Sequence, residues 1–195
     1  MSMRQRAREE TRRRILEATI QLHTEKGILG TSWKSIAERA DVAVGTVYNH
    51  FPDLDELVLA CGELLMQRLE PPDPEQAPKV VGDATRMRVR LERIARELFA
   101  FYERGGQHLE VFSGERDLPA IQEWEAYQRS TVEAYVRAAM GKRKSEHTVQ
   151  LMSALFDLRT YRALADRGIG LDEAVTTMAS TAECVLELRS KGATS

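Results

Sequence analysis

Residues 31–51 read Thr-Ser-Trp-Lys-Ser-Ile-Ala-Glu-Arg-Ala-Asp-Val-Ala-Val-Gly-Thr-Val-Tyr-Asn-His-Phe, and this stretch predicts two short helices joined by a tight turn. The hydroxyl of Thr31 or Ser32 can cap the first helix by accepting from an otherwise unbonded N–H. The second helix covers about residues 44–50, because Pro52 prevents it from continuing. Apolar residues at the spacing i, i+3, i+4 and i+7 mark one buried face of the first helix: Trp33, Ile36, Ala37 and Ala40.

The second helix of this pair has an apolar side and a polar side. Val47 and Phe51 lie four positions apart and are expected to pack against the first helix. Small residues at its start, 43–46, would let the helix approach a DNA major groove, where its N–H groups favour phosphate. An ordinary helical hairpin is the alternative that the pattern alone leaves open. The polar residues that then point elsewhere are Thr46, Tyr48, Asn49 and His50.

The composition is that of a globular protein with a substantial core. The chain has 195 residues, of which 43% are hydrophobic and 30% are charged. Helical spacing of the apolar residues nearly throughout predicts an all-α fold. No apolar run approaches the ~18 residues of a membrane span and no signal peptide is recognisable, so we expect a cytoplasmic protein without a membrane partner.

The charge is unevenly distributed along the chain. Residues 1–50 contain nine Lys or Arg and six Asp or Glu, a net charge of +3, whereas the remainder carries −5. A basic amino-terminal quarter on an acidic body fits DNA contact at one end. The alternative is that the arginines between positions 4 and 14 form a solvated tail and helix face.

The rest of the chain is predicted to be helical, with breaks at Gly and Pro. Gly27 ends the first helix as a left-handed cap, and residues 71–78, half of them proline, form a loop. A short helical segment is expected at about 107–112 and a loop at 141–144. The longer helices are expected at about residues 6–26, 54–70, 83–104, 119–140, 146–167 and 171–190.

The last two of these helices indicate an interface. A helix that is apolar on two sides must be buried by other helices on both sides. The helix expected at 146–167 has two such sides, Val149, Met152 and Phe156 on one and Leu151, Leu155 and Leu158 on the other. Together the two helices predict half of a four-helix homodimer interface, with core helices of a monomer as the alternative. The last helix offers Val175, Met178, Ala182 and Val185, with Ala179 and Ser180 beside them.

A set of residues spread over the first quarter of the chain, ending in Tyr-x-His-Phe at 48–51, resembles the DNA-binding domain of the TetR family of bacterial transcriptional regulators. The remainder is similar to the family only in length, helix count and helix placement. The matching residues are Arg13, Ile15, Leu16, Ala18, Gly27, Thr31, Ser32, Ile36, Ala37, Ala40, Val42, Gly45, Thr46, Tyr48, His50, Phe51 and Leu57.

The resemblance implies a homodimer of subunits with about nine helices. A three-helix helix–turn–helix DNA-binding domain would occupy residues 1–53. A helical ligand-binding and dimerisation domain would occupy 54–195, with the last two helices as the dimer interface. The implied function is a ligand-responsive regulator, most simply a repressor that binds a palindromic double-stranded DNA operator and is released by a small effector. The implied DNA-binding residues are Thr31, Ser32, Trp33, Ala43, Val44, Gly45, Thr46, Tyr48, Asn49 and His50.

Three positions depart from the family pattern. Asp41 stands where Gly is usual, and the turn is expected to survive because Asp tolerates left-handed geometry. Ala43 stands where Ser is usual, so a hydroxyl cap is lost. Leu54 stands where a phosphate-binding Lys is common, and the Arg-rich amino terminus could compensate, for example by reaching the minor groove.

Aromatic stripes in the second domain predict a pocket for a mostly hydrophobic effector. Such stripes at helical spacing are more often core, and the identity of the effector is not readable from them. The predicted lining is Phe99, Tyr102, Phe112, Trp124, Tyr127, Met152 and Phe156, with Tyr135, His147 and Arg159 as secondary candidates.

An enzyme is the main rival class, and the sequence supplies no catalytic residues for one. The four histidines lack metal-ligand spacing, and the Gly pairs at 105–106 and 168–170 lack the strand–loop–helix setting of a phosphate loop. Cys61 and Cys184 are expected to be buried hydrophobes rather than a disulfide or metal pair. We therefore expect no enzyme, metal or cofactor. A helical interaction module that binds no DNA is the third class.

Overall fold

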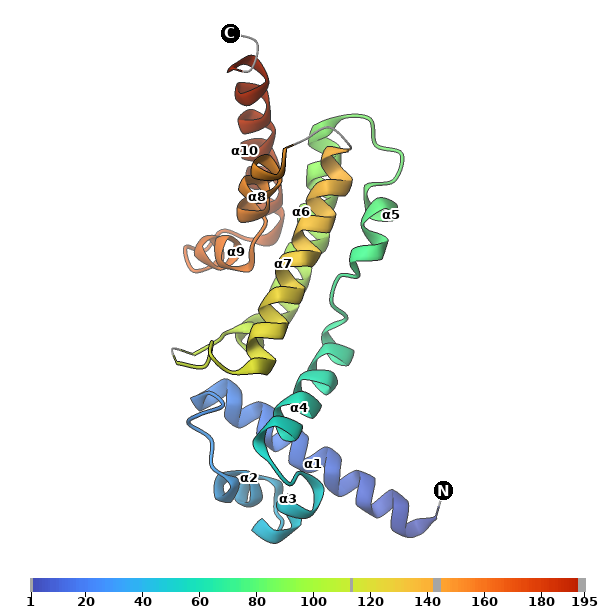
Figure 1. Cartoon of the computed structure of the whole chain (residues 1–195), viewed down its shortest axis with the longest axis vertical. Helices are drawn as coiled ribbons and strands as arrows, with labels where there is room; N and C mark the ends of the chain where they lie inside the picture. Colours follow the sequence, from blue (N-terminus) through green and yellow to red (C-terminus); the bar gives the residue numbers. More distant parts are fainter. Residues whose placement is uncertain (1, 113, 142–144, 193–195) are drawn as a thin grey trace. The chain divides into compact units, whose positions relative to one another are not determined.

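The computed structural model describes residues 2–112, 114–141 and 145–192, and every regular element in these ranges is a helix (Figure 1). The predicted all-α fold class is therefore confirmed. The loop expected at 142–144 lies outside the described residues. Within the described ranges, no helix combines the length and the apolar character that crossing a membrane requires.

The chain divides into two compact units whose boundaries do not follow the sequence order. The first unit contains Met1–Glu70 together with Gly106–Trp124, and the second contains Pro71–Gly105 together with Glu125–Ser195. A segment from the middle of the chain therefore completes the amino-terminal unit.

The first unit contains the helices predicted at the amino terminus, and side chains cap three of their starts. Ser2 and Ser32 each form a reciprocal capping box, and the Asp53 carboxylate accepts from the N–H of Glu56 at 2.9 Å. Gly27 ends the first helix at φ 78°, a conformation that favours glycine. The helices are α1 Met3–Lys26, α2 Trp33–Ala40, α3 Val44–His50 and α4 Leu54–Leu69, followed later in the chain by η2 Gly106–Leu109.

The core of the first unit lies where α1, α2, α3 and α4 meet. Helix α2 packs on α1 and α3, and α4 packs on α1. Removing apolar side chains from water is the main favourable term in folding. The largest side chains that are essentially inaccessible here are Ile15, Leu22, Ile36, Phe51 and Leu57, and the smaller Val47 is fully buried with them.

The mid-chain segment is bound to the end of α1 and to the turn that follows it. Glu115 is only 4% exposed, and its Oε1 accepts from the backbone N–H of Leu29 at 3.0 Å. His108 Nδ1 lies 2.7 Å from Thr24 Oγ1. A Cβ at Gly27 would collide with the Glu115 carboxylate, and the φ of 78° at this position also favours glycine. No pattern in the sequence predicts this contact.

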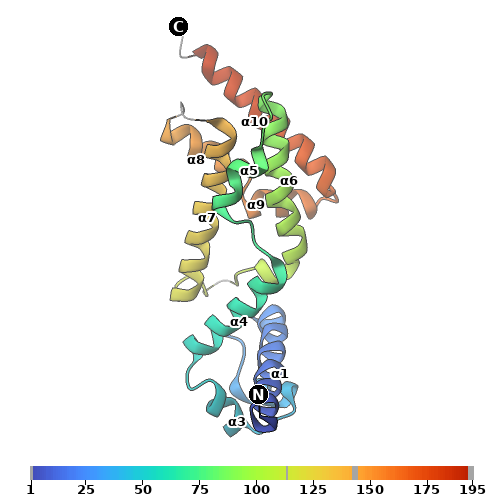
Figure 2. The ribbon, with the colours of Figure 1, turned by 90° about the vertical axis from the view of Figure 1, so that its right-hand side faces the viewer.

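The second unit is organised around the packing of α10 on α6. Figure 2 shows these two helices crossing. Ala174, Ala179 and Ala182 on α10 are completely buried, and their small side chains let the helices approach closely. The helices that contribute to this unit are η1 Pro74–Gln76, α5 Ala77–Val81, α6 Met87–Gly105, α7 Pro119–Met140, α8 Glu146–Leu155, α9 Leu158–Ala165 and α10 Leu171–Gly192.

Several expectations about the second unit are corrected by the structure. The single helix expected at 146–167 is broken, because Asp157 is extended (ψ 152°) and its carboxylate caps α9 through the N–H of Arg159 at 2.8 Å. The proline-rich stretch contains the helical turn η1, capped by Asp73. Proline is tolerated there because first-turn N–H groups lack helical partners anyway. Cys184 is exposed, whereas Cys61 is buried as expected.

The apolar residues of the last helix that we expected in a homodimer interface are partly buried within the unit. Val175 is 2% exposed and Ala182 is fully buried, so these two residues pack inside the unit, whereas Met178 and Val185 are half-buried. On α8, the side with Met152 is buried, whereas Leu151 on the other side is 39% exposed. Leu188 on α10 is 63% exposed.

His23 near the end of α1 predicts an acid-sensitive fold. Burial lowers its pKa from 6.5 to about 4, and its Nε2 has no hydrogen-bond partner among the described residues. Since the unfolded chain takes up the proton first, stability present above pH 6.5 is lost as the pH falls toward 4. The loss from this group is on the order of 2–3 kcal/mol.

The measurement is the free energy of unfolding in urea at pH 7 and pH 5 for the wild type and His23→Gln. The variant is expected to show the smaller decrease on acidification. Replacing the exposed His147 by Gln is the matched control. An equal decrease in the wild type and His23→Gln would show that His23 is not the acid-sensitive group.

Candidate nucleic-acid interface

The start of α2 is fixed by hydroxyl groups. Ser32 Oγ accepts from the N–H of Ser35 at 3.1 Å, and Thr31 Oγ1 donates to the carbonyl of Gly27 at 2.7 Å. Ser32 is exposed and Thr31 is half-buried. Both residues predicted to meet phosphate therefore lie at a helix amino terminus, whose N–H groups and dipole favour an anion.

The turn between α2 and α3 has the geometry expected from the sequence. Asp41 adopts a left-handed conformation (φ 53°, ψ 56°), which confirms that Asp can replace glycine in this turn. Ala43 occupies the N-cap position of α3 without a side-chain hydrogen bond. The first turn of α3 is consequently left without a hydroxyl cap.

Helix α3 presents the predicted polar face to the exterior of its unit. Val47 is fully buried and Phe51 is 2% exposed, so these two residues fix the rotation of the helix. On the opposite side Val44 is 39% exposed and Tyr48 is 46% exposed. Of the other predicted contacts, Ala43, Gly45 and Asn49 are exposed, and Thr46 and His50 are half-buried.

Trp33 links the two helices of the motif. Its ring stacks on Tyr48, with ring centroids 4.7 Å apart and an interplanar angle of 27°. Trp33 also packs, partly buried, against the core of the unit. The residue therefore supports the position of Tyr48 in addition to lying at the amino terminus of α2.

Gly45 has no partner inside the chain that would require it to be glycine. A Cβ placed on Gly45 would meet nothing within 4 Å, and the residue has no positive φ. An open glycine in the first turn of α3 leaves room for another molecule to approach the backbone closely.

Arg12 joins this surface although the sequence placed it only in a general basic stretch. Its guanidinium carbon lies 5.0 Å from the centroid of the Phe51 ring, directly after α3. The only sequence signal for it was the arginine content of residues 4–14. The partner ring could not be identified without the fold.

The residues predicted to line an effector pocket are only partly brought together. In the second unit Tyr102, Phe156 and Tyr161 gather around Phe99, and the Phe99 and Tyr161 ring centroids are 5.1 Å apart. The sequence did not single out Tyr161. Tyr102 Oη donates to the carbonyl of Phe156 at 3.1 Å. The other predicted residues are Met152, fully buried, Tyr127, exposed, and Phe112 and Trp124, which belong to the first unit.

The second unit also contains buried polar atoms without hydrogen-bond partners among the described residues. They include Gln128 Nε2 and Thr131 Oγ1 on α7 and Ser153 Oγ on α8. Such atoms cost free energy unless a water or a ligand satisfies them. The described residues include no cluster of His, Cys, Asp or Glu suited to a metal ion.

The capped α2, the left-handed turn and the anchored α3 define an all-α protein with an amino-terminal helix–turn–helix. The family model for "Bacterial regulatory proteins, tetR family" matches residues 15–61, which span this motif and its flanking helices. The match shows that residues 15–61 form a helix–turn–helix domain of the TetR type, as the resemblance predicted. The relatives that match this region are transcriptional regulators by name.

A curated relative resembles part of this chain in sequence, and solved structures resemble most of it in fold. The transcriptional repressor KstR of Rhodococcus jostii is 39% identical over 64 residues, which cover 33% of this chain and 30% of KstR. A TetR-like regulator from Rhodococcus sp. RHA1 superposes with a TM-score of 0.66 over 91% of this chain and 96% of its own, at 18% identity. The multidrug binding protein EbrR, crystallised with imidazole, superposes with a TM-score of 0.58 over 87% of this chain and 88% of EbrR, at 24% identity.

The sequence matches are confined to part of each curated relative. They span between 24% and 35% of the length of those proteins. The similarity of the second unit to solved structures is therefore a similarity of fold.

Proposed function

We propose that this protein is a ligand-responsive, DNA-binding transcriptional regulator. In its simplest form it is a repressor that binds a palindromic operator as a homodimer and is released by a small, mostly hydrophobic effector. The observation that carries the proposal is the anchoring of α3 by Val47 and Phe51, which leaves its other face open.

The open face of α3 has the chemistry of a major-groove reader. Its small first-turn residues let the backbone approach base edges, and Val44 can contact a thymine methyl group. Tyr48 and His50 are then placed for phosphate, with Asn49 as a further contact. Thr31, Ser32 and Trp33, at the start of α2, would contact the DNA backbone beside the groove.

The second unit supplies the features that an effector site needs. The cluster of Phe99, Tyr102, Phe156 and Tyr161 is apolar, and the unpaired atoms of Thr131 and Gln128 could orient a neutral polar group. EbrR, which has a similar fold, is named as a multidrug binding protein. In functional terms we assign residues 1–53 to DNA binding and 54–195 to regulation.

A homodimer would cover the apolar surface left on α8 and α10. Leu151 and Leu188 are exposed in the single chain, and Leu155 and Leu158 are half-buried. A two-fold operator is the natural target of a two-fold dimer, since each half-site meets one α3.

The test of DNA binding is fluorescence anisotropy with labelled duplex from immediately upstream of the protein's own gene, at low and moderate salt. We expect tight binding that weakens steeply as salt rises, because each phosphate contact releases counterions. Tyr48→Ala should bind at least ~10-fold more weakly, since it removes an exposed contact and the stack on Trp33.

Failure to bind this DNA, with capture of other genomic fragments, would place the operator elsewhere and keep the function. A folded dimer that binds no DNA fragment at all would refute the proposal. In that case a helical protein-interaction module would be the better description.

Gly45→Ala tests whether glycine at this position is required for stability or for DNA binding. The added methyl group meets nothing in the chain, so the free energy of unfolding should rise by about 0.5–1 kcal/mol. DNA affinity should fall at least ~10-fold, because the same methyl would stand between the helix and the groove. Gly62→Ala on α4 is the matched control, since its methyl group also meets nothing and should leave DNA affinity unchanged.

Leu151→Glu tests the dimer. A charge placed in an apolar interface should shift the protein to the 22.1 kDa monomer in sedimentation equilibrium. Leu59→Glu on α4, which replaces a leucine that is 51% exposed, is the control and should remain dimeric. A dimer that persists in Leu151→Glu would exclude this side of α8 from the interface.

A further inference from the structure

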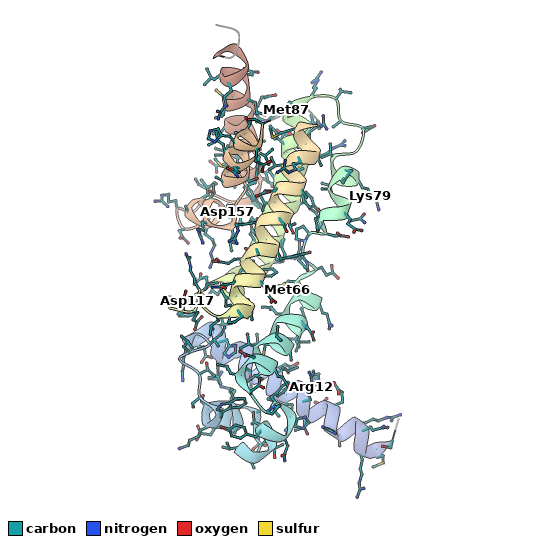
Figure 3. All side chains as sticks on the ribbon, viewed as in Figure 1. Arg12, Met66, Lys79, Met87, Asp117 and Asp157 are labelled. Carbon is teal, nitrogen blue, oxygen red and sulfur yellow. The ribbon has the colours of Figure 1, made fainter. Side chains whose placement is uncertain are left out.

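The starting point is the contact between α1 and the residue that ends α3. Arg12 is half-buried, and its guanidinium lies over the ring of Phe51 at 5.0 Å. Figure 3 labels Arg12 on α1. A cation held over an aromatic ring keeps its N–H groups available around its edge. Arg12 is thereby fixed beside the carboxyl end of α3.

A second arginine lies on the same side of α1. Arg8 is one helical turn before Arg12, and residues four apart project from the same face of a helix. Both arginines are close enough to His50 for their charges to act on it. Burial lowers the pKa of His50 first, and the positive charges of Arg8 and Arg12 lower it further, while Glu9 acts in the opposite direction.

Some arginines of this unit pair with carboxylates. Arg13 pairs with Glu10 at 2.9 Å and with Glu17 at 3.0 Å. Arg39 pairs with Glu25 at 2.9 Å. Among the described residues, no ion pair includes Arg8 or Arg12. The two positive charges are therefore left without a carboxylate partner next to the helix proposed to read DNA.

The start of α4, which follows α3 in the chain, has no positively charged side chain. Leu54 begins α4, directly after the α3–α4 connection, and it carries no charge. Asp53, Asp55 and Glu56 around it are acidic. The start of α4 therefore supplies no cationic side chain, and the cations on this flank of α3 come from α1.

We propose that Arg8 and Arg12 of α1 bind a DNA backbone phosphate on the flank of α3, so that the nucleic-acid interface extends beyond the helix–turn–helix. This inference rests on the proposed function as a DNA-binding regulator. Arg12 is fixed by Phe51 and is the better-ordered ligand, and Arg8 adds charge from the exposed side of the same face. A guanidinium suits phosphate because its parallel N–H groups can bond two oxygens at once.

Such a contact would contribute affinity and register but no sequence preference. It can therefore be measured before the operator is known. The site is also distinct from a minor-groove arm, because residues from Met3 onward are helical rather than extended.

The experiment compares three proteins on one short labelled duplex of arbitrary sequence, by anisotropy between about 50 and 200 mM salt. They are the wild type, Arg8→Gln/Arg12→Gln, and the control Arg6→Gln/Arg14→Gln, which removes the same charge from the other side of α1. Each lost phosphate contact should reduce the slope of log K against log salt by about 0.9. We expect this reduction in the first double variant only.

Two results would overturn the inference. One is an unchanged slope in Arg8→Gln/Arg12→Gln, and the other is an equal reduction in the control, which would indicate a general charge effect. If the wild type binds neither this duplex nor any genomic fragment, the proposed function itself fails, and that result is distinct from both.

Arg12 also packs on Phe51, so the double variant could lose stability. The single variant Arg8→Gln avoids this, because Arg8 is exposed and its replacement should leave the thermal midpoint unchanged. Arg8→Gln should still have a smaller slope of log K against log salt than the single control variant Arg6→Gln. An Arg8→Gln protein with wild-type stability and a wild-type slope would remove Arg8 from the site.

Discussion

The burial of Val47 and Phe51 is the constraint on which the rest of the first unit depends. Helix α3 has seven residues, and a helix this short is not stable by itself in water. It exists because these two side chains enter the core that also holds Ile36 and Leu57. The same anchoring fixes which residues point away from the unit, so the exposed position of Tyr48 is a consequence of packing on the opposite face.

A second constraint comes from a distant part of the chain. Glu115 is buried, and a buried carboxylate must find donors; it finds the N–H of Leu29 in the turn before α2. Together with the contact between His108 and Thr24, this joins a mid-chain segment to the amino-terminal helices. The unit that carries the helix–turn–helix is therefore not a continuous stretch of sequence.

Much of the first unit could be predicted from local chemistry. The apolar spacing in 33–40, the hydroxyl cap at Ser32 and the left-handed Asp41 are properties of short segments, and the structure contains each of them. In the second unit local chemistry was less decisive. The apolar spacing predicts a helix that continues through Asp157. The structure instead has a helix break there, because the Asp157 carboxylate caps α9, and the spacing alone does not reveal this break.

The sequence by itself determined the all-α fold, the TetR-type helix–turn–helix and the face of α3 that is left open, because periodicity, caps and turns act over a few residues. Tertiary structure alone decided which long-range partners those residues meet. Arg12 could be paired with the Phe51 ring, and Val175 assigned to the interior of its unit, only once the helices were packed. The physical reason is that a helical pattern shows which residues need cover, whereas the element that covers them depends on how the whole chain packs.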